Sequence, residues 1–336
     1  MRIAVLTTSY PRRGDESAGA FVLAGVEHLR AGGVGVEVVS PAGFRDFGLA
    51  YGDGIAANLR ARPVRAVLLP AFMASYARAA RRAAHEADLV HAHWLPSGLA
   101  AELTGKPFVV QVWGTDLELA QRLPWLFQRV LRQAAVVVAP STSLAGAAAA
   151  LGAERIRVLP SGVEIPERVA EPEQPPHLLY VGRLSAEKGI EELAEAAAGL
   201  PLVAVGDGPL SQLLPGAVGF VPPAELGVYY EQASVVVCPS RREGYGVAAR
   251  EAMAHGRPVV ASAVGGLLDA VEDGVTGLLV PPRDPRALRE ALERLLGDSR
   301  LRKQLGAAAR ERARERFSWE RATTATLDLY AEVLAG

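Results

Sequence analysis

The sequence predicts an α/β protein built from two doubly wound, Rossmann-like domains that face a central cleft. Two observations lead to this fold class. Short apolar runs alternate with helix-length segments along the whole chain, which is the pattern of parallel strands buried on both faces. The length of 336 residues, of which 50% are hydrophobic, is also more than one ordinary core accommodates. We therefore expect two domains, each with its own parallel sheet.

The first domain is expected over residues 1–165. Its apolar runs follow one another as "IAVLTT", "GVEVVS", "RAVLLP", "DLVHAHW", "FVVQVW", "AVVVAP" and "IRVLP". Each run has the length of a strand, and the amphipathic or alanine-rich segments between them predict the connecting helices. Because open α/β sheets bind ligands beyond the carboxyl ends of their strands, the residues that end these runs are the first candidates for a site.

A second series of apolar runs begins after the stretch "VEIPERVAEPEQPP" at residues 163–176, whose proline and glutamate content predicts a linker. The runs are "LLYVGR", "LVAVGDG", "VGFVP", "SVVVCPS", "RPVVAS" and "GLLVP". They predict a second domain over residues 176–318, and residues 319–336 read as a separate terminal helix.

Charge and cysteine content exclude several classes of protein. The 36 basic and 37 acidic side chains give a net charge of -1, so no nucleic-acid partner is expected. The single cysteine, Cys238, excludes an internal disulfide, and the start of the chain has no signal-peptide pattern. No apolar stretch reaches the length of about 20 residues that a membrane-spanning helix needs. We therefore expect a cytoplasmic protein.

Peripheral association with the inner membrane surface stays open. The first half of the chain has a small excess of basic side chains, and the segment "LPWLFQRVLRQ" combines Trp125, Leu126 and Phe127 with two arginines. Such a mixture can dock on a lipid surface. Burial of the segment against the sheet is the other interpretation.

The segment "SRREGYGVAARE" places two carboxylates, Glu243 and Glu251, after one of the predicted strands. Gly244 and Gly246 predict a loop between them, followed by a helix that begins near Val247. Glu243 is then a loop residue and Glu251 a helix residue. This arrangement disfavours the carboxylate dyad of a retaining glycosidase, in which the two groups lie about 5 to 5.5 Å apart.

Two separated carboxylates suit two points on an extended ligand. A nucleotide sugar has a diol on its ribose and hydroxyl groups on its sugar, with a diphosphate between them, and a carboxylate accepts hydrogen bonds from hydroxyl groups. The segment "VGRLSAEKG" supplies Arg183 and Lys188, which have the charge to bind the diphosphate. Taken alone, this pair is equally well explained as a solvated loop.

The motifs of the second half resemble those of the retaining family 4 glycosyltransferases, which have a Glu-x7-Glu signature and the two-domain GT-B fold. The resemblance is carried by "VGRLSAEKGI", by "VGDGP" and by "CPSRREGYGVAAREAMAHGRPVVASAVGG", and it covers most of residues 178–318. The segment "FSWERATTATLDLYAEVL" resembles the terminal helix of that family, which crosses back to the first domain. The resemblance implies transfer of a sugar from a nucleoside-diphosphate sugar to a glycan, lipid or small-molecule acceptor, without a cofactor or an essential metal.

The resemblance also implies a role for individual residues. Arg183 and Lys188 would bind the diphosphate, Glu251 the ribose diol and Glu243 the transferred sugar. Further donor-binding positions lie in the two glycine loops, and they are Gly244, Tyr245, Gly246, Gly265 and Gly266. Asp269 stands where relatives have a glutamate and is a weaker candidate, and a simple turn is the other explanation for the second glycine pair.

The first domain contributes fewer candidates. In "LVHAHW", His91 and His93 point to the same face of a strand, and the resemblance implies that His93 contacts the transferring sugar. A core or hydrogen-bonded role is the more frequent explanation for such a pair, and local spacing offers no third metal ligand. Asp116 is a weaker candidate that also suits a helix N-cap. The loop after the first strand contains Gly14 and Gly19, and the resemblance implies that this loop approaches the donor phosphate, with Gly19 as the donor-binding candidate. Arg12 and Arg13 are weaker candidates.

Two alternative functions stay open. One is a nucleotide-sugar epimerase of similar architecture, which would act without an acceptor. The other is a non-catalytic protein that binds nucleotide sugars. The sequence leaves the donor sugar, its base, the acceptor, the linkage and the oligomeric state undetermined.

Overall fold

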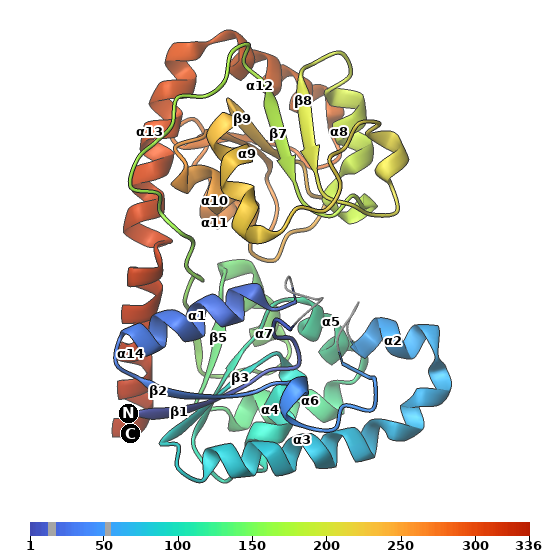
Figure 1. The fold of residues 1–336 in the computed structure, drawn as a ribbon, viewed down its shortest axis with the longest axis vertical. Coiled ribbons are helices and arrows are strands. Elements are labelled where there is room, and N and C mark those ends of the chain that lie inside the picture. Colours follow the sequence, from blue (N-terminus) through green and yellow to red (C-terminus); the bar gives the residue numbers. More distant parts are fainter. Residues whose placement is uncertain (13–17, 51–54) are drawn as a thin grey trace. The chain divides into compact units, whose positions relative to one another are not determined.

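A computed structural model describes residues 1–12, 18–50 and 55–336, and the chain divides into two compact units (Figure 1). Unit 1 contains Met1–Ser161 together with Ala322–Gly336, and unit 2 contains Gly162–Arg321. Each unit has a parallel sheet with helices on both faces, so the predicted α/β class with two doubly wound, Rossmann-like domains is confirmed. No helix in the described part of the chain has the length and apolar character needed to cross a bilayer.

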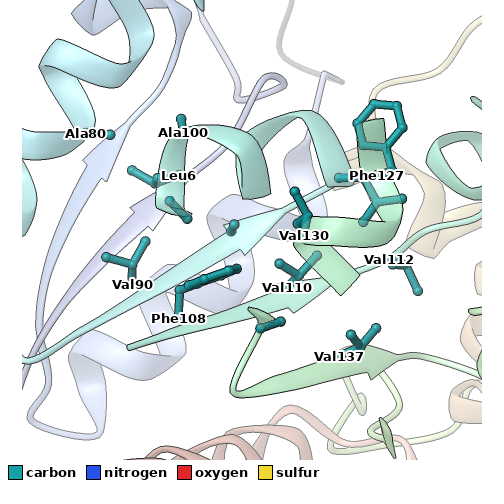
Figure 2. Packing of buried hydrophobic residues seen from close by; sticks show 14 of the residues in the cluster. Leu6, Ala80, Val90, Ala100, Phe108, Val110, Val112, Phe127, Val130 and Val137 are labelled. Carbon is teal, nitrogen blue, oxygen red and sulfur yellow. The ribbon is translucent and has the colours of Figure 1, made fainter. Parts of the chain in front are cut away.

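Unit 1 is built on a six-stranded parallel sheet with the strand order β2-β1-β3-β4-β5-β6. The strands are β1 (Arg2–Leu6), β2 (Gly35–Val39), β3 (Leu89–His93), β4 (Phe108–Gln111), β5 (Val136–Ala139) and β6 (Ile156–Val158). The helices are α1 (Ala20–Ala31), α2 (Ile55–Ala61), α3 (Leu69–Ala84), α4 (Leu95–Glu102), α5 (Thr115–Arg122), α6 (Pro124–Gln133) and α7 (Thr142–Ala150). Figure 2 shows one face of this sheet, where strand residues such as Val90, Val110 and Val137 pack with Phe127 and Val130 of α6.

One apolar run of the first half is not a strand. The run "RAVLLP" lies in a 3-10 helix, Pro63–Leu68, that leads directly into α3, so the strand prediction was wrong here. Pro63 and Pro70 provide no backbone N–H for a sheet ladder, and proline is well suited to the first turn of a helix. Val64 and Val67 are exposed, as they could not be in a central strand.

Unit 2 has a five-stranded parallel sheet with the order β11-β10-β9-β7-β8. Its strands are β7 (Leu178–Val181), β8 (Leu202–Val205), β9 (Val235–Cys238), β10 (Val259–Ser262) and β11 (Gly277–Val280). Its helices are α8 (Ile190–Ala196), α9 (Leu226–Gln232), α10 (Val247–Ala254), α11 (Leu267–Ala270), α12 (Pro285–Gly297) and α13 (Ser299–Arg316). Two buried apolar clusters, one on each face of the sheet, form the core.

The run "VGFVP" in the second half is not a strand either. It contributes only an isolated antiparallel bridge between Gly206 and Gly219. Gly219 has a φ of 86°, which lies in the left-handed region, and two prolines follow it. Both features interrupt an extended ladder, so this prediction was wrong for a local reason.

The segment expected to be a linker packs against unit 2. Arg257 donates to the carbonyl oxygen of Ala170 at 2.6 Å, and Arg310 donates to the carbonyl oxygens of Pro166 and Glu167. The backbone N–H of Val163 donates to the carbonyl oxygen of Phe317 at 2.7 Å. Two mostly buried guanidinium groups therefore attach residues 163–170 to the second unit.

The terminal helix α14 (Trp319–Ala335) begins in unit 2 and continues in unit 1 from Ala322 onward. Leu329 and Tyr330 are buried in the core of unit 1 next to α1 and the sheet. The Tyr330 hydroxyl lies 2.5 Å from Nδ1 of His91. Both chain termini are thus part of unit 1 (Figure 1).

Candidate functional site

The loops after β7 and β9 bring together two residues of the predicted donor site. The ammonium nitrogen of Lys188 lies 2.7 Å from Oε2 of Glu243, and the Ser240 hydroxyl donates to the same oxygen at 3.3 Å. The two charged side chains are 31% and 16% exposed, so the ion pair is only partly screened by water. β7 and β9 are neighbours in the sheet, which is why two loops so distant in sequence meet.

The close approach of these loops depends on Gly189. This residue follows the short 3-10 helix Ala186–Lys188 and has a φ of 71°. A Cβ atom at this position would lie 2.0 Å from the carbonyl oxygen of Pro239, which no real Cβ contact allows. Glycine therefore lets the backbone beside Lys188 touch the loop that carries Glu243.

Arg183 follows β7 but is not joined to the Lys188 and Glu243 pair. Its side chain is exposed, and within the described residues it has no ion-pair partner. Its carbonyl oxygen accepts a hydrogen bond from the Tyr180 hydroxyl at 2.8 Å, which fixes the backbone of the loop. The structure therefore leaves this guanidinium available to an anion but does not orient it.

A buried arginine that the sequence did not predict as a site residue connects the loop of Gly244 and Gly246 to the loop of Gly265 and Gly266. Arg250 is fully buried in α10, and its guanidinium lies 3.8 Å from the centroid of the Tyr245 ring. It donates to the carbonyl oxygens of Tyr245 and Gly246, and Nη2 donates to that of Gly266 at 3.3 Å. Carbonyl oxygens and an aromatic face offset the cost of burying this charge. The available signal was an arginine within the alanine-rich helix "VAAREAMA".

Gly265 and Gly266 are required by packing between the same two loops. A Cβ on Gly265 would lie 1.9 Å from the carbonyl oxygen of Glu243, and one on Gly266 would lie 2.5 Å from that of Gly244. The N–H of Gly266 also donates to the Glu243 carbonyl oxygen at 3.0 Å. These glycines therefore set the position of the Glu243 backbone, whatever they contribute to a ligand.

Gly265→Ala is expected to lower the free energy of unfolding by about 1 to 3 kcal/mol, because the new Cβ meets the Glu243 carbonyl and φ is 49°. Urea denaturation measures this loss. Gly274→Ala is the matched control, since Gly274 has a φ of 71° but nothing within 4 Å of its Cβ position. A loss no larger than that of the control would contradict the steric explanation.

Glu251 has a different partner from Glu243. Its Oε2 accepts a hydrogen bond from the Tyr230 hydroxyl at 2.7 Å. Burial raises the pKa of the Glu251 carboxyl, and the hydrogen bond from Tyr230 lowers it in part. The helix that carries Glu251, α10, begins at Val247 as the sequence predicts.

In unit 1, β3 places His91 and His93 on one face, as predicted from their spacing. The two rings are stacked at 4.5 Å, and His93 also stacks with Trp113 at 6.0 Å. Burial, and then the neighbouring His91, hold the pKa of His93 well below its usual range. His93 is therefore a neutral ring at physiological pH. The described residues contain no cluster of three potential ligands that would suit a metal ion.

The structure gives Asp116 a structural role. Its carboxylate accepts hydrogen bonds from the backbone N–H groups of Trp113, Gly114 and Leu95 at 3.0, 2.9 and 3.2 Å. It lies in the first turn of α5 rather than at the N-cap, which is Gly114. Asp116 thus ties the loop after β4 to the start of α4.

Gly19 and the weaker candidates lie in separate elements. Gly19 is the N-cap of α1, where its φ of 67° and close approach to the Ser9 carbonyl favour glycine. Arg12 is exposed, and Arg13 and Gly14 lie outside the described residues. Asp269 is half-buried in α11, and its carbonyl oxygen accepts from Arg312 at 3.2 Å.

Two family models match the chain, one for each unit. The model described as Glycosyltransferase Family 4 matches residues 18–166, and the model described as Glycosyl transferases group 1 matches residues 175–298. A D-inositol 3-phosphate glycosyltransferase of Xylanimonas cellulosilytica is 33% identical over 79% of this chain and 76% of its own length. A glycogen synthase of Mycobacterium tuberculosis is 31% identical over 74% of this chain and 70% of its own length.

Two solved structures superpose on nearly the whole of this chain. A sucrose-phosphate synthase from Thermosynechococcus elongatus superposes with a TM-score of 0.82 at 27% identity, covering 100% of this chain and 99% of that chain. Anabaena HepE in complex with UDP-glucose superposes with a TM-score of 0.75 at 21% identity, covering 99% and 100% of the two chains. At that identity HepE supports the fold alone.

Proposed function

Because the chain belongs to the family 4 glycosyltransferases and is a glycosyl-transferring enzyme, we propose that it takes its sugar from a nucleoside-diphosphate donor held by unit 2. The observation that carries this proposal is the Lys188 and Glu243 ion pair beside the glycine-rich start of α10. In the donor the diphosphate and the sugar are adjacent, so a cation could bind the diphosphate while the carboxylate beside it binds the sugar. The UDP-glucose bound by HepE is a ligand of this kind.

Lys188 and Arg183 would neutralise the departing diphosphate. The ammonium group of Lys188 has three donors, so it can keep Glu243 and bind a phosphate oxygen at once. The Arg183 guanidinium, exposed in the same loop, adds a second charge. Because both groups act where negative charge accumulates in the transition state, the proposal includes neither a cofactor nor a metal.

Transfer would proceed with retention of configuration at the anomeric carbon. The bond between this carbon and the diphosphate oxygen breaks, and the acceptor oxygen forms its new bond on the same face. The proton of the acceptor hydroxyl passes to the departing phosphate oxygen. Glu243 would bind hydroxyl groups of the transferred sugar, and Gly244, Tyr245 and Gly246 would place its backbone close to the donor.

The acceptor is proposed to be a sugar-containing, lipid-linked or small molecule that reaches the strand ends of unit 1. His93 is the residue of unit 1 that we assign to the transferring sugar, because it is a neutral, buried ring at the carboxyl end of β3. A neutral imidazole can hydrogen-bond a sugar hydroxyl without holding a charge in an apolar site. The named relatives act on different acceptors, so the class is left broad.

Peripheral membrane association is a further part of the proposal. In α6, Phe127 is buried while Trp125 is 74% exposed, so the helix presents an aromatic side chain on its outer surface. Trp125→Ser should reduce co-sedimentation with vesicles that contain anionic lipid. Equal sedimentation of both proteins would remove this helix as a contact.

A screen of nucleotide sugars tests the donor proposal. Binding to the folded state raises the melting temperature, so UDP, GDP and ADP sugars can be ranked by thermal shift. The best donor is then incubated with and without acceptors, and the product is analysed by NMR. Glycosyl transfer that needs an acceptor supports the proposal. An epimerised donor without any acceptor indicates an epimerase, and binding without turnover indicates a binding protein.

His93→Ala is expected to reduce transfer far more than it weakens nucleoside diphosphate binding, because the nucleotide is assigned to unit 2. Since burial holds the pKa of His93 well below its usual range, the ring gains no proton as pH falls from 8 through that usual range. The ratio of wild-type to variant rates should therefore show no step at the usual pKa of a histidine. His85→Ala, an exposed histidine of the same unit, is the control. Full transfer by His93→Ala would remove the residue from the mechanism.

A further inference from the structure

Tyr230, which the sequence reading did not single out, is the partner of the carboxylate assigned to the ribose. It lies in α9, is 1% exposed, and donates its hydroxyl proton to Oε2 of Glu251 at 2.7 Å. Of the described residues, it is the one side chain that hydrogen-bonds this carboxylate. A carboxylate on a short flexible side chain has several orientations, and one hydrogen bond to a rigid phenol selects among them.

Both the backbone and the ring of Tyr230 are held in place by neighbouring residues. Arg257, which is 4% exposed, donates from Nε to the Tyr230 carbonyl oxygen at 2.9 Å and from Nη2 to the Glu231 carbonyl oxygen at 2.6 Å. These are among the last carbonyls of α9, where a cation is favourable. The phenol ring stacks on His255 at 5.4 Å, and His255 follows the same helix that carries Glu251.

We propose that Tyr230 is a positioning residue for ribose recognition: it fixes one oxygen of Glu251 and thereby aims the carboxylate at the ribose diol. The inference rests on the proposed function, in which Glu251 binds the ribose. Arg257 supports it by fixing the end of α9 from which the tyrosine projects. Without the hydroxyl, Glu251 would have to be ordered by the ligand, and affinity would fall because ordering then costs part of the binding free energy.

The same hydrogen bond favours the ionised form of Glu251. Burial raises the pKa of this carboxyl and the bond from Tyr230 lowers it in part, so loss of the phenol hydroxyl would raise the pKa further. Two titratable groups near Glu251 are neutral around pH 7, and the charged groups near it are Arg257, on the carbonyl oxygen of Tyr230, and the pair of Lys188 and Glu243. Burial lowers the pKa of His255 to about 4, and it raises that of Cys238, at the end of β9, to about 12. Lys188 and Glu243, which also act on Cys238, compensate one another as an ion pair.

Tyr230→Phe removes one oxygen atom and keeps the ring, so it tests the inference directly. The probe is whichever of UDP, GDP and ADP stabilises the wild type most, compared with its 2′-deoxy form by calorimetric titration. We expect affinity for the ribonucleotide to fall on the order of tenfold, the loss of one hydrogen bond to a charged group, and the preference over the 2′-deoxy form to shrink. The acid limb of binding should also move to higher pH, because the carboxyl becomes easier to protonate.

Two further variants separate positioning from packing. Tyr76→Phe is the matched control, because Tyr76 is fully buried in unit 1 with its hydroxyl 2.8 Å from that of Ser97, and its loss should leave nucleotide binding unchanged. In a Glu251→Gln background, Tyr230→Phe should have a much smaller effect on binding.

Three outcomes overturn the inference. An equal loss of affinity for the ribo and deoxy nucleotides, with an unmoved acid limb, would mean that Tyr230 only supports the fold. Unchanged affinity would mean that it does not act on Glu251. If the wild type binds both nucleotides equally, the ribose assignment of Glu251 is wrong and the inference falls with it.

Discussion

Lys188→Ala is expected to lower the turnover number on the order of a hundredfold or more, with the fold intact. The substitution removes the ammonium group that pairs with Glu243 at 2.7 Å, and with it the charge assigned to the departing diphosphate. An interaction that strengthens as the phosphate departs contributes to turnover rather than to ground-state binding. Steady-state kinetics with saturating donor measure the loss, and thermal unfolding checks the fold.

Lys303→Ala is the matched control for Lys188→Ala. Lys303 lies 3.7 Å from Glu171 in an ion pair whose side chains are 75% and 83% exposed, so its removal should change neither rate nor stability measurably. A cycle with Glu243→Gln separates the direct effect of Lys188 from the effect of leaving Glu243 without its partner. Unchanged kinetics in a folded Lys188→Ala protein would remove the residue from the mechanism.

The meeting of Lys188 with Glu243 was predictable because it follows from a general property of parallel sheets. Both residues come shortly after apolar runs that predict buried strands, and the carboxyl ends of such strands lie at one edge of a sheet. The structure adds that β7 and β9 are direct neighbours, which the sequence does not state. The sequence can therefore predict that residues after such strands lie at the same edge of the sheet, but it does not give the distances between their side chains.

Arg250 and Tyr230 escaped prediction for a physical reason. Each acts through contacts that only the packed helices create: Arg250 through carbonyl oxygens of two separate loops, and Tyr230 through a carboxylate on another helix. Taken alone, an arginine in a short helix predicts a solvated side chain, and a tyrosine before a buried strand predicts core packing. The strand predictions at "RAVLLP" and "VGFVP" were wrong for a local reason. Proline and glycine in or beside these runs argue against a strand, but the prediction relied on their apolar content alone.

Glu251→Ala is expected to weaken donor nucleotide binding by about 2 to 4 kcal/mol, because it removes a carboxylate that accepts hydrogen bonds from ribose hydroxyl groups. Calorimetric titration with the nucleoside diphosphate measures the loss, and the variant should no longer prefer the ribonucleotide over its 2′-deoxy form. Glu290→Ala is the control, since Glu290 is 65% exposed in a pair with Arg286 on α12. Equal affinity of Glu251→Ala and the wild type would refute the ribose assignment.

The folding stability of the protein provides a second, independent test of the role of Glu251. Because burial raises the pKa of Glu251 above its unfolded value, the folded protein holds the proton more tightly, and stability falls as pH rises between the unfolded and folded pKa values. Above the folded pKa the ionised carboxylate therefore costs stability. Glu251→Gln keeps an acceptor for Tyr230 without the charge, so it should unfold at the same or a higher temperature than the wild type at pH 7 while losing donor affinity. A residue that lowers stability and raises affinity is maintained for binding, whereas a marked loss of stability in Glu251→Gln would make it part of the structural framework.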